Sequence, residues 1–171
     1  DKIIALCEDN SKNLWGGTTG GGGNVIPLHM ISEGNSDFVT YRHNLKDVKS
    51  LSHNDVYCIL QDHRQQIWIG TGGGLNYVEW DHNQPLTEAL LKGEISFVSY
   101  LEKDGLSNGV VYGILGDRKG NLWLSTNNGL SMFNPEARQF INYNVNDGLQ
   151  ANEFYENAYY KDKQGRMFFG G

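Results

Sequence analysis

Asp117-Arg-Lys-Gly-Asn-Leu-Trp-Leu-Ser-Thr-Asn-Asn-Gly-Leu130 is the stretch of sequence that decides the fold, because its central pattern recurs along the chain. The pattern is an Asp followed six residues later by an aromatic residue, and successive copies lie roughly 45 to 55 residues apart. A period of this length, built from short β-rich runs and tight turns, is typical of a β-propeller, in which each repeat forms one blade. The four pairs are Asp9/Trp15, Asp62/Trp68, Asp117/Trp123 and Asp162/Phe168.

The third repeat shows most clearly how one blade is built. Val110–Leu115 is apolar at consecutive positions, which predicts an innermost strand buried on both faces. The sequence from Asp117 to Asn121 predicts a tight hairpin in which the Asp accepts backbone N–H bonds. A second strand then carries the Trp between neighbouring blades, Gly129-Leu130 opens a third strand, and 140–143 forms an outer strand. Equivalent innermost strands are expected at Ile3–Cys7, Val56–Leu60 and Glu156–Tyr160.

Four strands per repeat give an all-β fragment of a β-propeller, with about three four-stranded blades and a half blade. The blades are expected at about 1–43, 44–101, 102–144 and 145–171. In a meander, the second-to-third turns and the crossings between blades share one end, here called the upper face. The hairpins and the third-to-fourth connections share the lower face, where the segment from Pro85 to Gly93 is expected to form a short helix. Gly20–Gly23 is expected to form a flexible turn at the end of a strand, because no βαβ pattern supports a phosphate-binding loop.

An arc of three and a half blades leaves unpaired edges, since closed propellers have four to eight blades. We therefore expect this chain to be part of a larger propeller. Its expected partners are the missing blades or a second copy of the chain.

Composition excludes several classes of function. The net charge is −6 and the 14 Lys and Arg residues are dispersed, which argues against binding of nucleic acid. The sequence contains no apolar run of 18 residues and no signal-peptide pattern. Cys7 and Cys58 occupy different positions within their repeats, so no disulfide is predicted, and Cys58 is expected to be a small buried side chain.

Polar residues gather in the crossings and turns of the upper face, beside Tyr57, Tyr112 and Tyr155. Amides, carboxylates and aromatic rings together offer the hydrogen bonds and stacking surface that a sugar-binding site needs. The same residue types also satisfy their own turns, and this structural interpretation stays open for each of them. The predicted ligand-binding residues are His53, Asn54, Asp55, Asn108, Asn127, Asn128, Asn152 and Glu153.

The sequence predicts no metal site, cofactor or catalytic residue. The Asp of each hairpin lacks the alternating carboxylates of a calcium loop, and the histidines lack metal-ligand spacing. His53 with Asp55, and Glu153 with Glu156, are conceivable acid and base groups, but a local sequence cannot establish the separation that catalysis requires.

The string 117–130 and its echoes resemble the two-component regulator propeller repeat. The closing segments Asp147-Gly-Leu149, Asn152-Glu-Phe154 and 165–171 look like the terminal blade of that family. The first repeat is less regular, and the crossing from Leu149 to Asp162 is two residues longer than its counterparts.

This resemblance implies a periplasmic sensor region of a hybrid two-component system of the kind known in Bacteroidetes. Such a region recognises a glycan-derived oligosaccharide and signals to a histidine kinase through a membrane-anchored parent protein. The chain itself carries none of the kinase motifs and is not expected to be an enzyme. A propeller enzyme, such as a lyase or glycosidase, and a scaffold for protein partners are the alternatives.

Overall fold

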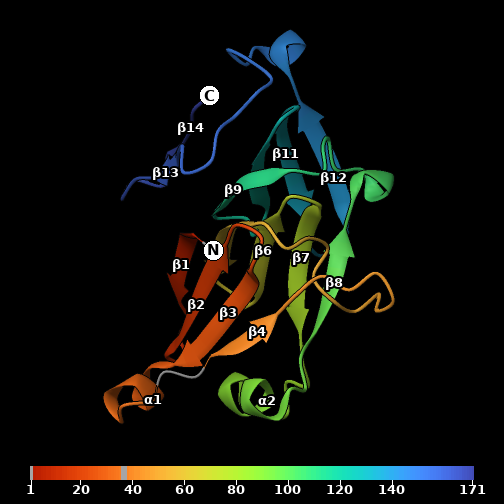
Figure 1. Cartoon of the computed structure of the whole chain (residues 1–171). Coiled ribbons are helices and arrows are strands. Elements are labelled where there is room, and N and C mark those ends of the chain that lie inside the picture. Colours follow the sequence, from red (N-terminus) through yellow and green to blue (C-terminus); the bar gives the residue numbers. More distant parts are fainter. Residues whose placement is uncertain (1, 36–37) are drawn as a thin grey trace.

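The computed structural model describes residues 2–35 and 38–171, which form antiparallel sheets arranged in an arc (Figure 1). Within these ranges three sheets have four strands and one has two, and each four-stranded sheet follows chain order. Sheet 1 contains β1 (Ile3–Glu8), β2 (Asn13–Thr18), β3 (Gly22–Pro27) and β4 (Val39–Tyr41); sheet 2 contains β5 (Val56–Gln61), β6 (Ile67–Thr71), β7 (Gly74–Glu79) and β8 (Ser96–Tyr100). Sheet 3 contains β9 (Val111–Gly116), β10 (Leu122–Thr126), β11 (Gly129–Asn134) and β12 (Gln139–Tyr143), and sheet 4 contains β13 (Tyr159–Lys161) and β14 (Met167–Phe169). The predicted all-β fragment of three blades and a half is confirmed.

Two details of the innermost strands differ from the prediction. Strand β13 begins at Tyr159, because residues 156–157 form a turn in which Asn157 has a φ of 61°. Strand β1 is not buried on both faces: Ile3 is 62% exposed and Leu6 is 66% exposed. The outer side of sheet 1 has no other sheet against it among the described residues, which explains this exposure.

Both third-to-fourth connections of sheets 1 and 2 contain a helix, and both helices lie at the lower end in Figure 1. Helix α2 (Leu86–Lys92) confirms the predicted helix and ends at Gly93, whose φ is 69°. Helix α1 (Leu28–Ser32) was not predicted. The crossings contain 3-10 turns at η1 (Glu102–Asp104) and η2 (Val145–Asp147). The prediction for Gly20–Gly23 was wrong in part, because Gly22 and Gly23 belong to β3 and pair with β2.

The six-residue offset between Asp and Trp has a direct structural cause in the hairpins. In sheet 2, Asp62 Oδ1 accepts the backbone N–H groups of Arg64 and Gln66, at 2.8 and 3.0 Å. Its other oxygen, Oδ2, accepts the indole N–H of Trp68 at 3.0 Å. Trp15 and Trp123 donate in the same way to the Asp six residues before them, at 2.8 and 3.3 Å. One carboxylate therefore closes the turn and fixes the ring.

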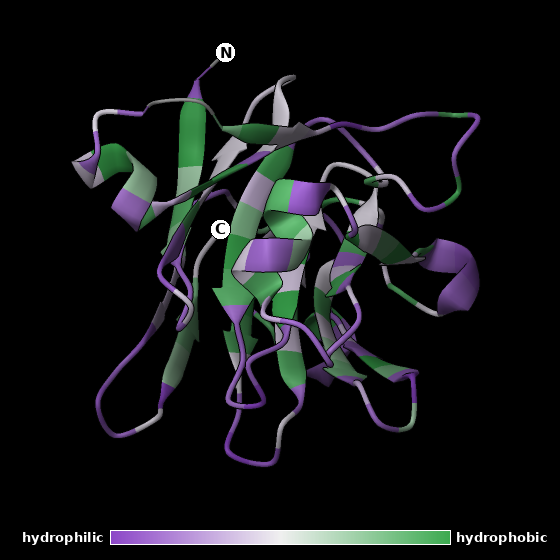
Figure 2. Cartoon of the chain, turned by 90° about the horizontal axis from the view of Figure 1, so that it is seen from below, coloured by the Kyte–Doolittle hydropathy of each residue, from purple (hydrophilic) through white to green (hydrophobic). Residues whose placement is uncertain are grey.

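Sheets 1 and 2 each pack against the next sheet through their second-strand Trp. Trp15 is 1% exposed and shares a core with Val56, Ile67 and Ile69 of sheet 2. Trp68 is 2% exposed and lies in a core with residues of sheet 3, its ring centroid 5.8 Å from that of Phe133. Figure 2 shows the result, with mainly apolar strands and mainly polar connecting loops. The cores between sheets hold the arc together and leave the loops of both faces for other roles.

Candidate functional site

The innermost strands carry a repeated irregularity at the upper face that builds an aromatic pair. In sheets 2 and 3 the pairing register with the second strand shifts by one residue, leaving Tyr57 of β5 and Tyr112 of β9 outside the ladder. A β-bulge of this kind re-aims the side chain of the extra residue. The two rings meet edge to face, with centroids 5.0 Å apart and planes at 63°. Sheet 1 has the same shift, but there the extra residue is Ile4.

The surroundings of Tyr57 are acidic. Partial burial raises the pKa of the Tyr57 hydroxyl, and the charges of Asp55 and Glu156, together with Tyr112, raise it further. The phenol therefore stays neutral and able to donate a hydrogen bond at physiological pH. From the sequence, Glu156 was expected to begin an innermost strand and to be one half of a conceivable catalytic pair. Its approach to Tyr57 could not be inferred from the sequence, because the two residues come from different repeats.

His53, Asn54 and Asp55 lie at the junction of sheets 1 and 2, and much of their hydrogen-bonding capacity serves the fold. Asn54 accepts the N–H of His43 through its side chain at 2.8 Å, and Asp55 Oδ1 accepts the N–H of Gly20 at 2.7 Å. His53 Nδ1 accepts the N–H of Asp55 at 3.0 Å. Asp55 Oδ2 is 3.6 Å from His53 Nδ1, and the side chains of His53 and Asp55 are 44% and 26% exposed. These two residues keep polar surface in contact with solvent.

Three of the other predicted residues also stabilise their own loops. Asn108 accepts the N–H of Val110 at 2.9 Å, as His53 does in the preceding crossing. Asn152 accepts the N–H of Val145 at 3.0 Å, the counterpart of the Asn54 bond. Asn128 donates its side-chain amide to the carbonyl of Ser107 at 3.3 Å. These groups therefore have a structural role in their loops, and ligand binding by them stays a prediction.

Asn127 and Glu153 are the predicted residues whose side chains form no hydrogen bond within the described ranges. Both are exposed. Their segments are held together, since Phe154 N–H donates to the carbonyl of Thr126 at 3.2 Å and Gly129 N–H donates to the carbonyl of Asn152 at 2.6 Å. One group of predicted residues, 53–55, therefore lies where sheets 1 and 2 meet, and another, at 127–128 and 152–153, lies where sheet 3 meets the last crossing. Tyr57 and Tyr112 belong to strands β5 and β9.

Beneath the turns lies a buried polar network that the sequence analysis missed. Ser52 Oγ lies 2.8 Å from Thr71 Oγ1, and Asn76 donates to Ser52 Oγ, also at 2.8 Å. Ser107, Thr126 and Ser131 repeat this arrangement one sheet later. The sequence contains a sign of this network, because a Leu-Ser pair recurs in both crossings, at 51–52 and 106–107. The network anchors the crossings that carry the upper-face residues.

Between 2–35 and 38–171, no group of three or more His, Cys, Asp and Glu side chains is placed to hold a metal ion. None of the helices in those ranges has the length and apolar character needed to cross a membrane. Cys58 is 1% exposed, as expected, and its burial raises the pKa of the thiol.

The comparisons with known proteins agree with the architecture. The family described as "Two component regulator propeller" matches residues 50–73 and 105–128. Over 96% of its length the chain is 27% identical to "Histidine kinase P4" of Formosa agariphila, and it spans 14% of that protein.

Solved structures extend the agreement to the whole chain. The extracellular domain assigned to a hybrid two-component system of B. thetaiotaomicron superposes with a TM-score of 0.76 and 25% identity, over 98% of this chain and 20% of that one. An inactive virginiamycin B lyase of Staphylococcus aureus superposes with a TM-score of 0.62 at 12% identity, over 98% of this chain and 48% of that one, a likeness of fold alone. Two stretches of this chain thus match the two-component regulator propeller family, and the chain is similar to a part of a histidine kinase and to an extracellular domain of a hybrid two-component system.

Proposed function

We propose that this chain forms part of the periplasmic sensor region of a membrane-anchored histidine kinase or hybrid two-component regulator, and that it binds a glycan-derived oligosaccharide without turning it over. The relatives support the sensor part, because one is a histidine kinase and another is the extracellular domain of a two-component system. The tyrosine pair supports the ligand part.

The main support for a sugar ligand is the contact between the rings of Tyr57 and Tyr112, together with the acidic charges that act on Tyr57. Aromatic faces stack on the apolar faces of sugar rings, while carboxylates accept hydrogen bonds from sugar hydroxyls. Asp55 and Glu156, whose charges raise the pKa of Tyr57, are the carboxylates proposed for this role. Asn127 and Glu153 add exposed polar groups at the next upper-face junction. Two bulges place the rings outside their strand ladders without disturbing the cores between sheets.

Calorimetric titration with a panel of oligosaccharides, with a parallel assay for their breakdown, tests the proposal. For a sugar that binds, Tyr112→Ala should weaken binding about tenfold, which corresponds to about 1.4 kcal/mol of lost contact. Tyr112→Phe keeps the ring and should bind within a few-fold of the wild type. Tyr160→Ala is the matched control, because Tyr160 is 63% exposed and is not one of the aromatic residues of the upper face.

Three outcomes would contradict the proposal. A panel in which no oligosaccharide binds would argue against the ligand class. Equal binding by the wild type and Tyr112→Ala would argue against the site. Breakdown of the bound sugar would favour the enzyme, an alternative kept open by the lyase that shares this fold.

A further inference from the structure

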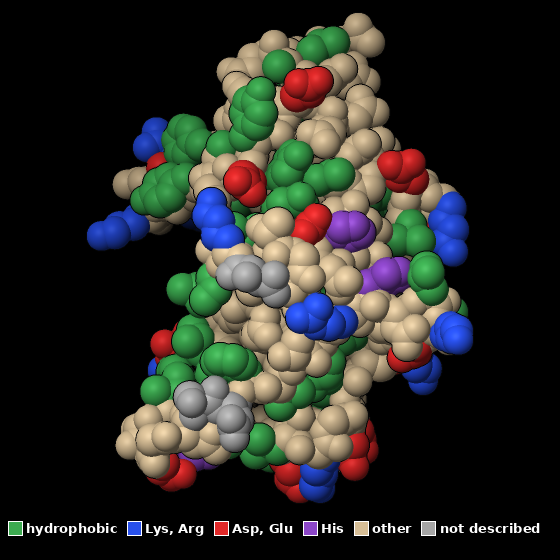
Figure 3. Space-filling model, in the orientation of Figure 1, with side chains coloured by type: hydrophobic (Ala, Val, Ile, Leu, Met, Phe, Trp, Pro, Cys, Tyr) green, Lys and Arg blue, Asp and Glu red, His purple; other side chains and the backbone are tan. Residues whose placement is uncertain are grey.

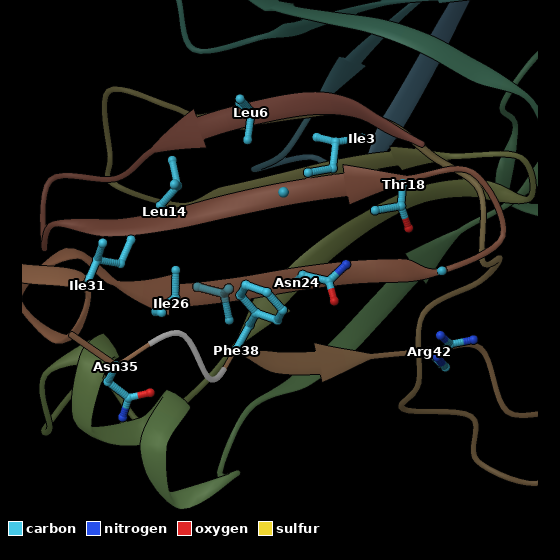
Figure 4. A pocket seen from close by; sticks show the side chains of 13 residues that line it. Ile3, Leu6, Leu14, Thr18, Asn24, Ile26, Ile31, Asn35, Phe38 and Arg42 are labelled. Carbon is cyan, nitrogen blue, oxygen red and sulfur yellow. The ribbon is translucent and has the colours of Figure 1, made fainter. Parts of the chain in front are cut away.

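The outer side of sheet 1 is an exposed apolar face. Ile3, Leu6 and Phe38 are 62%, 66% and 59% exposed, although all three are large hydrophobic side chains. Together with Leu14 and Ile26 they line a hollow of about 410 Å³. Figure 3 shows apolar side chains on the side of the molecule where β1–β3 lie, and Figure 4 shows the hollow over these strands. Ile3, Leu6, Leu14, Ile26 and Phe38 are called the open face below.

The open face has a counterpart on each of the next two sheets. Strand pairing and the position of the hairpin Asp identify the equivalent residues, and every one of them is apolar. In sheets 2 and 3 these faces are buried, apart from Ile59 and Phe140, which are partly buried, whereas in sheet 1 the face is open. The counterparts are Val56, Ile59, Ile67, Val78 and Phe97 in sheet 2, and Val111, Ile114, Leu122, Phe133 and Phe140 in sheet 3.

What covers the two buried counterparts is visible in the structure. In both cases it is the preceding sheet, which contributes a second-strand Trp and a fourth-strand Tyr. Trp15 enters the core formed with sheet 2, and the ring of Tyr41 lies 5.3 Å from that of Phe97. Trp68 lies 5.8 Å and Tyr100 lies 4.6 Å from the ring of Phe133 in sheet 3. The same pair of rings is thus used twice on the same set of positions.

The two helices reinforce the parallel. Helix α2, in the third-to-fourth connection of sheet 2, buries Leu86 and Leu90 in the core that contains Trp15. Its Thr87 also donates to the Asn13 side chain of sheet 1 at 2.9 Å. Helix α1 occupies the same connection in sheet 1, and its Ile31, 46% exposed, lines the hollow (Figure 4). Ile31 is placed to contact whatever covers the open face, as α2 contacts sheet 1.

The hollow also has room for a large ring. Gly16 lies on its floor, where sheets 2 and 3 carry the buried side chains Ile69 and Leu124. A Cβ at Gly16 would meet only ordinary contacts, the nearest at 3.8 Å from Leu6, so nearby atoms do not force a glycine there. The missing side chain enlarges the space available to an incoming indole.

We infer that the open face binds a further four-stranded blade of this repeat type, whose second-strand Trp and fourth-strand Tyr fill the hollow against Leu6, Leu14 and Phe38. Such a blade can be recognised in a sequence by a Trp six residues after a hairpin Asp and by a Tyr in its fourth strand. A second copy of the chain offers less, because its sheet 4 has two strands among the described residues and presents Phe168 in place of the Trp.

The chain supplies a test blade of its own. Residues 56–110 contain sheet 2 and the crossing that follows it. In the extended protein, a copy of 56–110 is joined directly before Ile3, so that the added blade precedes sheet 1 and its Trp68 can pack on the open face. The reporter is Leu6→Asp, compared in the original chain and in the extended protein by thermal unfolding. In the original chain Leu6 is exposed, and the substitution should lower Tm by less than about 2 °C. In the extended protein it should lower Tm by at least about 6 °C, because a charge is then buried without a partner.

Two controls locate the effect. Leu45→Asp changes a side chain that is 91% exposed and does not line the hollow, so its effect should be small and equal in both proteins. Trp68→Ala in the added blade should remove most of the extra sensitivity to Leu6→Asp.

Three results would overturn the inference. The first is an equal effect of Leu6→Asp in both proteins. The second is an added blade that stays unfolded beside a folded chain, as judged by near-ultraviolet circular dichroism. The third is a Tm of the original chain that rises with protein concentration and loses that dependence in Leu6→Asp, since a second copy would then be the occupant.

Discussion

At the scale of single residues, one carboxylate explains why Asp and Trp recur six positions apart. One carboxylate oxygen accepts the backbone N–H groups of the hairpin, and the other accepts the indole N–H. The fourth copy has Phe168, whose ring has no N–H to donate. There Arg166 donates to Asp162 Oδ2 instead, at 2.6 Å. The Asp is retained because the hairpin needs it, and the donor to its second oxygen changes with the aromatic residue.

Removing this carboxylate should cost most where a buried indole depends on it. Asp62→Ala leaves the N–H of Trp68, a residue 2% exposed, without its acceptor and opens the hairpin bonds. We expect a loss of about 2–3 kcal/mol in the free energy of unfolding, measured with urea. Asp162→Ala is the matched control, because no indole depends on that carboxylate, and its effect should be smaller. Equal losses in the two variants would contradict the indole's part in the account.

At the scale of the element, the hairpins require a left-handed residue three positions after the Asp. Gly120 and Gly165 fill this position with φ of 86° and 85°, while Lys12 and Gln65 adopt φ of 64° and 65°. Residues other than Gly adopt this left-handed conformation at a free-energy cost of about 1–2 kcal/mol. Two of the four hairpins therefore contain backbone strain.

Exchanging these residues should move stability in opposite directions. Gln65→Gly relieves the strain, and we expect a gain of about 0.5–1 kcal/mol after the extra chain entropy of Gly. Gly120→Ala should lose about 1–2 kcal/mol, because φ is 86° and the new Cβ would lie 2.9 Å from His63 Cε1. Both are measured by urea unfolding against the wild type. A loss of stability in Gln65→Gly would refute this interpretation of the hairpins.

The hairpins and second strands could be predicted from sequence because they are local and repeat with a fixed offset. The bulges at Tyr57 and Tyr112 could not, because they depend on a pairing register that no short sequence pattern specifies. The same holds for Glu156, which approaches Tyr57 from a different repeat. Among the eight predicted site residues, Asn54, Asn108 and Asn152 form hydrogen bonds within their own loops, and Asn127 and Glu153 are exposed; their binding of a ligand stays a prediction.

At the scale of the whole molecule, sheets 1 and 2 each pack a second-strand Trp against the following sheet, and no described sheet packs such a ring against the open face of sheet 1. Apolar cores between the sheets hold the arc, while crossings and turns at the upper face carry the polar residues to which the proposed function assigns recognition. A sensor built in this way can change its ligand through loop residues without repacking its cores.

The most direct test of this architecture is hydrogen exchange at the four indole N–H groups, followed by NMR on the unmodified chain. Trp15 and Trp68 are buried between sheets and bonded to an Asp, so their N–H groups should exchange most slowly, with Trp123 next. Trp80, whose N–H has no hydrogen-bond partner in the described ranges, should exchange more than about a hundredfold faster than Trp15 and Trp68. Exchange at Trp15 and Trp68 as fast as at Trp80 would contradict the claim that indole rings wedge neighbouring blades together.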